Sequence, residues 1–122
     1  MDNFFNRKSE EMGPIILKNY SPDPKQIEIK LQREGSEVFY ETYELSAQGE
    51  NTSERQIYQW KQDNQAAEWT VSAKLDSTTW ESESFGADAP PYCHVVEVRI
   101  GEWKYDPLLI VVNDCAAMTV DY

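Results

Sequence analysis

The feature of this sequence that most constrains its fold is a strict two-residue alternation of apolar and polar side chains. Apolar side chains occupy every second position of residues 69–75, starting at Trp69, and of residues 26–32, starting at Ile27. Successive side chains of a strand point to opposite faces of the sheet, so each segment predicts a β-strand with one buried face. No segment shows a convincing helical period, and the chain is therefore predicted to be all-β.

Turn residues divide the rest of the chain into further short strands. The predicted strands cover residues 15–17, 26–32, 38–45, 55–60, 69–75, 78–85, 94–100 and 107–113, with 116–122 as a possible last one. Turns at residues 34–36 and 101–106 predict two hairpins. The expected fold is a two-sheet antiparallel β-sandwich of about seven or eight strands, immunoglobulin-like and without a metal.

A chain of 122 residues fits a single domain with one hydrophobic core. Gly13 and Pro14 favour a turn and mark the end of the first segment. Residues 1–13 are therefore predicted to form a flexible N-terminal arm and residues 14–122 the sandwich. Phe4 and Phe5 on this arm either contact a neighbouring subunit or fold back onto their own domain. The first residues contain no apolar segment typical of a signal peptide, and a soluble chain is expected.

Charge excludes several classes of partner. The chain has 22 Asp and Glu against 11 Lys and Arg, a formal net charge of -11. Binding to nucleic acids or to anionic membranes requires cationic surface, so neither is expected. Simple solubility by self-repulsion and a halophilic surface both explain the acidity. The even spread of the carboxylates along the chain favours the halophilic interpretation.

The only two cysteines, Cys93 and Cys115, lie nearly opposite each other across the second predicted hairpin. They form a disulfide if the protein is exported, or remain two buried thiols. His94 is the sole histidine, which excludes the usual copper site of small β-sandwiches because that site needs two imidazoles. Neither a metal nor another cofactor is predicted.

The sequence shows no recognisable arrangement of catalytic residues. Glu81 and Glu83 share one face of a predicted edge strand, where paired acids could hydrolyse glycosides. Such pairs are unavoidable in so acidic a chain, and charged residues commonly protect edge strands from pairing. The sequence therefore predicts no enzyme.

Aromatic residues provide the main indication of binding. Tyr58, Trp60 and Trp69 are expected to fill the core. Trp103 and Tyr105 lie in a predicted turn, where burial is difficult, and are candidates for an exposed contact patch together with Phe4 and Phe5.

Two segments match the acceptor pattern for N-linked glycans. Asn19 and Asn51 are each followed two positions later by Ser, and both lie in predicted loops. Glycosylation of either residue would require export of the protein.

Several segments resemble small β-sandwich domains of haloarchaeal proteins of unknown function. They are Ile16-Leu17-Lys18-Asn19, residues 27–31, residues 37–45 and residues 68–76, so the resemblance covers residues 15–76. It implies an immunoglobulin-like or cupredoxin-like sandwich without a metal and without catalytic activity. Many proteins of this kind are exported or lipid-anchored, whereas this chain shows no such signal.

The predicted function is a non-catalytic structural or protein-interaction module of a halophilic archaeal system. It would associate with itself or with a partner protein, at a cell surface or in a virus particle. The alternative is a small-ligand or carbohydrate-binding domain that uses exposed aromatic side chains, with Trp103 and Tyr105 as the stacking platform.

Overall fold

A computed structural model describes residues 11–50, 53–63, 67–76, 79–86, 93–103 and 106–114. The described part of the chain forms eight strands and one short 3-10 turn. The strands are β1 (Glu11–Asn19), β2 (Lys25–Arg33), β3 (Ser36–Leu45), β4 (Glu54–Ile57), β5 (Glu68–Leu75), β6 (Trp80–Gly86), β7 (Cys93–Trp103) and β8 (Asp106–Asp114), and the 3-10 turn is η2 (Lys61–Asp63).

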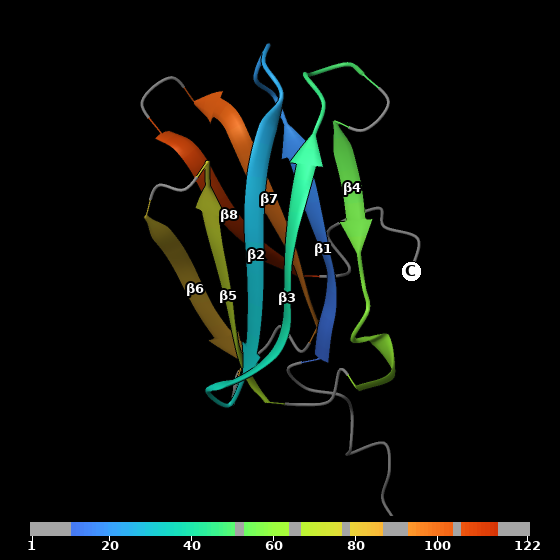
Figure 1. The fold of residues 1–122 in the computed structure, drawn as a ribbon. Coiled ribbons are helices and arrows are strands. Elements are labelled where there is room, and N and C mark those ends of the chain that lie inside the picture. The colour runs from blue at the N-terminus through green and yellow to red at the C-terminus, as the bar shows by residue number, and fades with distance from the viewer. Residues whose placement is uncertain are drawn as a thin grey trace, which may run out of the picture.

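The strands form two four-stranded sheets that pack face to face (Figure 1). Sheet A has the order β4-β1-β7-β8, and sheet B has the order β3-β2-β5-β6. At one side of the sandwich the edge strands β6 and β8 come together. The ring of Phe85 on β6 also lies 4.7 Å from that of His94 on β7. The predicted all-β, two-sheet sandwich is confirmed.

Both predicted hairpins are present. β2 pairs antiparallel with β3, and β7 pairs antiparallel with β8. In the second hairpin His94 lies opposite Asp114, which is the register expected for Cys93 and Cys115. Cys115 lies outside the described residues, as does the side chain of Cys93, so the disulfide remains a prediction.

One strand pair differs from the predicted antiparallel arrangement. β1 runs parallel to β7, with Ile15 opposite Val96 and Leu17 opposite Val98. Strands joined by a tight hairpin must be antiparallel, but β1 and β7 are far apart in the sequence, so a parallel pairing is open to them. The prediction of entirely antiparallel sheets was wrong at this position.

The core lies between the two sheets and is built by the alternating apolar side chains. Trp69, Ile29 and Val96 are fully buried there. Trp60 is 5% exposed, and its indole Nε1 donates a hydrogen bond to the carbonyl of Gly13 at 3.0 Å. Tyr58 is half-buried against the same core, which confirms the predicted role of the three aromatic side chains.

Several predicted boundaries move in the structure; β7, for example, extends to Trp103, into the predicted turn at residues 101–106. β1 begins at Glu11, and Met12 is fully buried, so residues 11–13 belong to the sandwich rather than to a flexible arm. β4 ends at Ile57, because the chain turns at Tyr58, whose carbonyl accepts a hydrogen bond from the backbone N–H of Lys61. Residues 1–10, with Phe4 and Phe5, and the predicted strand 116–122 lie outside the described residues.

Asn19 is a structural residue, and its position argues against the predicted glycosylation there. It ends strand β1 instead of lying in a loop, and only 3% of it is exposed. Its amide Nδ2 donates to the carbonyls of Asp23 and Ser46, both at 2.9 Å, and its Oδ1 accepts from the Ser21 backbone N–H. A glycan on this nitrogen would replace one of its two N–H groups, so at least one donor bond would be lost, and the buried side chain leaves no room for the sugar. Asn51 lies outside the described residues.

Candidate interaction surface

The outer face of sheet A, which points away from sheet B, is closed to solvent around its centre. Ile16 and Val95 point outward from β1 and β7, yet they are 7% and 0% exposed. Glu97, on the same face of β7, is 3% exposed. This face therefore offers little free surface at its centre.

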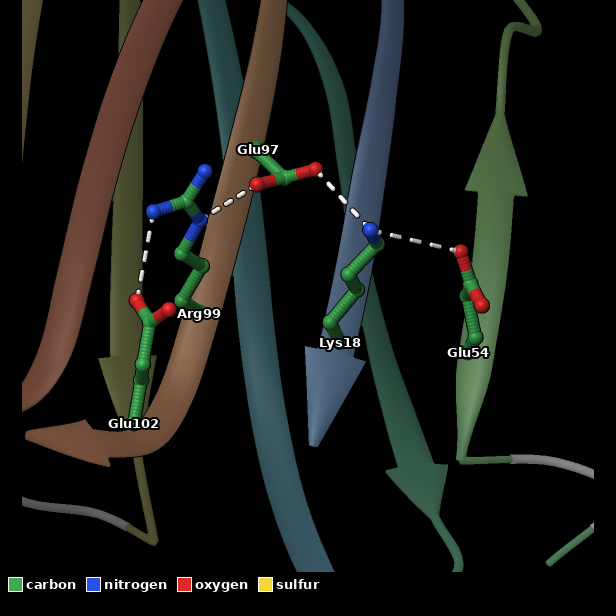
Figure 2. A network of polar contacts seen from close by, with 5 residues as sticks. All are labelled: Lys18, Glu54, Glu97, Arg99 and Glu102. Carbon is green, nitrogen blue, oxygen red and sulfur yellow. Dashed lines mark hydrogen bonds and ion pairs between the residues drawn. The ribbon is translucent and has the colours of Figure 1, made fainter. Parts of the chain in front are cut away.

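A chain of ion pairs crosses this face from β4 through β1 to β7 (Figure 2). The Nζ atom of Lys18 lies 3.2 Å from Glu97 Oε2 and 3.8 Å from Glu54 Oε2. The other oxygen of Glu97 accepts a hydrogen bond from Arg99 Nε, and Arg99 Nη1 lies 3.2 Å from Glu102 Oε1. Glu97 thus stands between two cations.

The protonation of Glu97 follows from these contacts. Burial raises the pKa of the Glu97 carboxyl, but the hydrogen bonds from Arg99 and Lys18 outweigh burial and hold the pKa below its ordinary value. A general acid needs a raised pKa so that it carries a proton at neutral pH. Glu97 is instead held as a carboxylate, and its arrangement is that of a structural ion pair.

The outer face of sheet B carries the exposed apolar surface of the described residues. Val38 and Tyr40, both on the edge strand β3, are 39% and 45% exposed. Trp80 begins the opposite edge strand β6, and its ring meets that of Tyr40 edge to face, with centroids 6.0 Å apart. The two edges are three strand spacings apart, roughly 14 Å. The side chains of Tyr40 and Trp80 therefore extend toward each other across the outer surface of β2 and β5.

Charged side chains from the two middle strands join these rings. Lys30 Nζ lies 4.6 Å and Lys74 Nζ 5.1 Å from the centroid of the Trp80 ring. Glu28 accepts a hydrogen bond from the Tyr40 hydroxyl and lies 3.4 Å from Lys74 Nζ. We call these five residues, Glu28, Lys30, Tyr40, Lys74 and Trp80, the aromatic–lysine cluster.

The hydrogen bond between Tyr40 and Glu28 shifts both groups. It lowers the pKa of the Glu28 carboxyl and raises the pKa of the Tyr40 hydroxyl. Both groups therefore keep their ordinary neutral-pH forms, a carboxylate and a protonated phenol, over a wider pH range. The cluster is not a proton-transfer pair, because neither pKa moves toward neutrality.

Beside the cluster, hydroxyl groups pair across the strands of sheet B. Ser72 and Ser82 share a hydrogen bond of 2.7 Å, and Thr70 and Ser84 one of 2.8 Å. These four side chains belong to β5 and β6 and lie opposite each other in register. Part of their hydrogen-bonding capacity is thus used within the sheet.

Glutamates occupy both edges of sheet B. Glu81 and Glu83 lie opposite Ala73 and Val71, on the side of β6 that faces sheet A, and both are exposed at the edge. Glu41 takes the equivalent position opposite Ile29 on β3 and is also exposed. Inward-pointing charges at an edge oppose the addition of another strand. The predicted edge position of Glu81 and Glu83 is confirmed.

The side chains of all four predicted contact residues, Phe4, Phe5, Trp103 and Tyr105, lie outside the described residues. Trp103 ends strand β7, but its side chain lies outside the described residues, as does the whole of Tyr105. Sequence reasoning missed Tyr40. The run Val38-Phe39-Tyr40 breaks the alternation by placing three apolar residues in succession, and that excess of apolar residues was the available signal.

Comparison with protein-family models, with curated proteins and with solved structures gives no match. The described residues contain no helix that is long and apolar enough to cross a membrane. They also contain no group of three or more His, Cys, Asp or Glu side chains placed to hold a metal ion. The haloarchaeal family therefore stays a prediction.

Proposed function

We propose that this chain is a non-catalytic protein-interaction module that binds its partner through the outer face of sheet B. The observation that carries the proposal is the position of the exposed apolar surface. Tyr40 lies on this face with its ring against Trp80, and Val38 is exposed on the same strand, whereas the apolar side chains at the centre of the other outer face are buried. Aromatic side chains at the centre of an interface often supply much of its binding energy.

The edges of sheet B support binding through the face rather than by strand addition. An added strand would have to lie beside Glu41 on β3, or beside Glu81 and Glu83 on β6. Unpaired carboxylates at those positions would lose hydration without gaining a partner. The partner is therefore expected to cover the aromatic–lysine cluster from above the sheet.

The alternative function, carbohydrate binding, has less support on this face. A sugar ring stacks on a free aromatic face, whereas Lys30 and Lys74 already lie over the ring of Trp80. Sugar hydroxyls also need free hydrogen-bonding groups, and the nearby pair Ser72 and Ser82 bond to each other. The stacking platform predicted at Trp103 and Tyr105 stays a separate prediction.

The proposed setting is a halophilic system, at a cell surface or in a virus particle. Its support is the net charge of -11, which keeps a surface hydrated in concentrated salt. Binding through an apolar face suits such a setting, because excluded salts strengthen apolar burial, and salt screens fully exposed ion pairs much more than partly buried ones.

Native mass in extracts of the producing cells tests this function. We expect the chain to elute in size-exclusion chromatography well above the mass of its 14.2 kDa monomer. The double variant Val38→Ser, Tyr40→Ser should elute as the monomer, while Glu54→Gln on sheet A should elute as the wild type does. Elution of the wild type as a monomer, or of both variants in the larger species, would contradict the proposal.

A further inference from the structure

Lys30 has unusual surroundings for a lysine of so acidic a chain. It is partly buried in the middle of the outer face of sheet B, opposite Tyr40 on one side and Ser72 on the other. Within the described part of the chain its ammonium group makes no ion pair, and Nζ lies 4.6 Å from the centroid of the Trp80 ring. Carboxylates outnumber cations two to one in this sequence.

The other partly buried lysines of the described residues each have a carboxylate partner. Lys18 lies 3.2 Å from Glu97, Lys25 lies 3.7 Å from Asp76, and Lys74 lies 3.4 Å from Glu28. Removing an ammonium group from water is costly unless a negative charge or hydrogen-bond acceptors replace the lost hydration. Lys30 is thus set apart by its position and its missing carboxylate.

The balance of charge in the aromatic–lysine cluster also indicates that Lys30 lacks a carboxylate partner. The cluster holds two ammonium groups and one carboxylate, Glu28, which is already bonded to Tyr40 and near Lys74. Within the cluster one positive charge is therefore left over, opposite the exposed Tyr40. Glu37, exposed on the same strand β3, is a further carboxylate near this group, because its charge helps to raise the pKa of the Tyr40 hydroxyl. A partner that combines a carboxylate with apolar side chains would match both features.

We propose that the outer face of sheet B binds an acidic segment of a partner protein, with an Asp or Glu carboxylate paired to Lys30 and neighbouring apolar side chains packed on Val38 and Tyr40. This inference rests on the proposed function and specifies the chemistry of the partner. The aromatic rings exclude water around the ammonium group, which strengthens its attraction for a carboxylate.

Two matched peptides test the proposal by nuclear magnetic resonance titration of the full chain labelled with 15N. One is the blocked pentapeptide Leu-Glu-Tyr-Glu-Leu, and the other carries Gln in place of both Glu. The signals followed are the backbone amides of Lys30 and Lys74 and the indole N–H of Trp80. We expect the Glu peptide to bind about threefold to fivefold more tightly, the gain that one partly exposed ion pair gives.

Variants then assign the preference to Lys30. Lys30→Gln should remove the difference between the peptides, and Lys30→Arg should keep it. Lys61→Gln is the matched control, because Lys61 also lies over an aromatic ring, that of Tyr58 at 5.9 Å, but is exposed away from the cluster. The Lys61→Gln variant should keep the wild-type preference, and unchanged melting temperatures would show that all three variants fold.

The other outcomes separate this inference from the proposed function. Equal binding of both peptides at the cluster would overturn the acidic partner while leaving the face as a protein-binding surface. No shift at the cluster with either peptide would count against both. A stronger response to trigalacturonate than to the Glu peptide would overturn the acidic protein segment in favour of an acidic sugar.

Discussion

The amide of Asn19 shows how one side chain can join two segments that are distant in the sequence. It bonds to the backbone of Ser21, Asp23 and Ser46, and so fixes the turn after β1 against the end of β3. The same turn approaches β7, where the Tyr20 backbone N–H donates to the carbonyl of Ile100 at 2.8 Å. Gly101, which follows Ile100, therefore lies close to this turn.

Gly101 should be much less tolerant of a side chain than Gly35. Both have positive φ angles, +74° and +84°, so replacement by Ala strains the backbone by about 1–2 kcal/mol at either position. A Cβ atom at Gly101 would lie 3.1 Å from Ser21 Cβ, whereas nothing lies within 4 Å at Gly35. We expect Gly101→Ala to lower the free energy of unfolding by about 1 kcal/mol more than Gly35→Ala. Urea denaturation measures both, and equal losses would contradict the contact with Ser21.

At the scale of the elements, the chain of ion pairs on sheet A connects three strands, β1, β4 and β7, no two of which are consecutive in the sequence. Glu54 lies on β4, Lys18 on β1, and Glu97 with Arg99 on β7. The lowered pKa of Glu97 means that the folded state holds this carboxylate charged more firmly than the unfolded chain does. The resulting stabilisation exists above the ordinary carboxyl pKa and is lost as the pH falls through the lowered one.

Glu97→Gln should therefore cost stability at neutral pH and reduce the acid sensitivity of the fold. We expect a loss of about 1–3 kcal/mol in the free energy of unfolding at pH 7. The difference from the wild type should narrow as the pH falls below about 4. Glu54→Gln, at the exposed end of the chain of ion pairs, should cost less than about 0.5 kcal/mol. Denaturation curves across this pH range give the answer, and a constant difference would argue against a lowered pKa.

Local patterns predicted the elements better than they predicted their partners. Alternation identified β2 and β5, and turn residues identified both hairpins, because these features depend on neighbours in sequence. The parallel pairing of β1 with β7 joins distant segments and has no local signal. The aromatic–lysine cluster was equally hidden, since Tyr40 and Trp80 meet only once β2 and β5 lie between them in the sheet.

At the scale of the whole molecule, the charge of the proposed binding surface differs from that of the chain as a whole. The chain carries a net charge of -11, yet the aromatic–lysine cluster has more cations than carboxylates. Repulsion among the carboxylates opposes the compact state, and dissolved salt screens that repulsion. The charge should thus make stability depend on salt while leaving one face suited to a partner.

Thermal unfolding should shift upward with salt. Between about 0.1 M and 1 M NaCl, screening of like charges should raise the melting temperature by at least about 3 °C, the shift that roughly 1 kcal/mol produces in a domain of this size. Differential scanning calorimetry at pH 7 measures the shift. A melting temperature that stays constant or falls would remove the halophilic interpretation of the acidic composition.

Site-specific photo-crosslinking in the producing cells tests the central claim, that the outer face of sheet B is the binding surface. A benzophenone amino acid would replace Tyr40 on this face or, as the control, Gln62, which is also exposed but lies in η2 outside sheet B. We predict a discrete crosslinked product of one mass from position 40 and none from position 62. Products of the same mass from both positions, or only from position 62, would contradict the assignment of this face as the interaction surface.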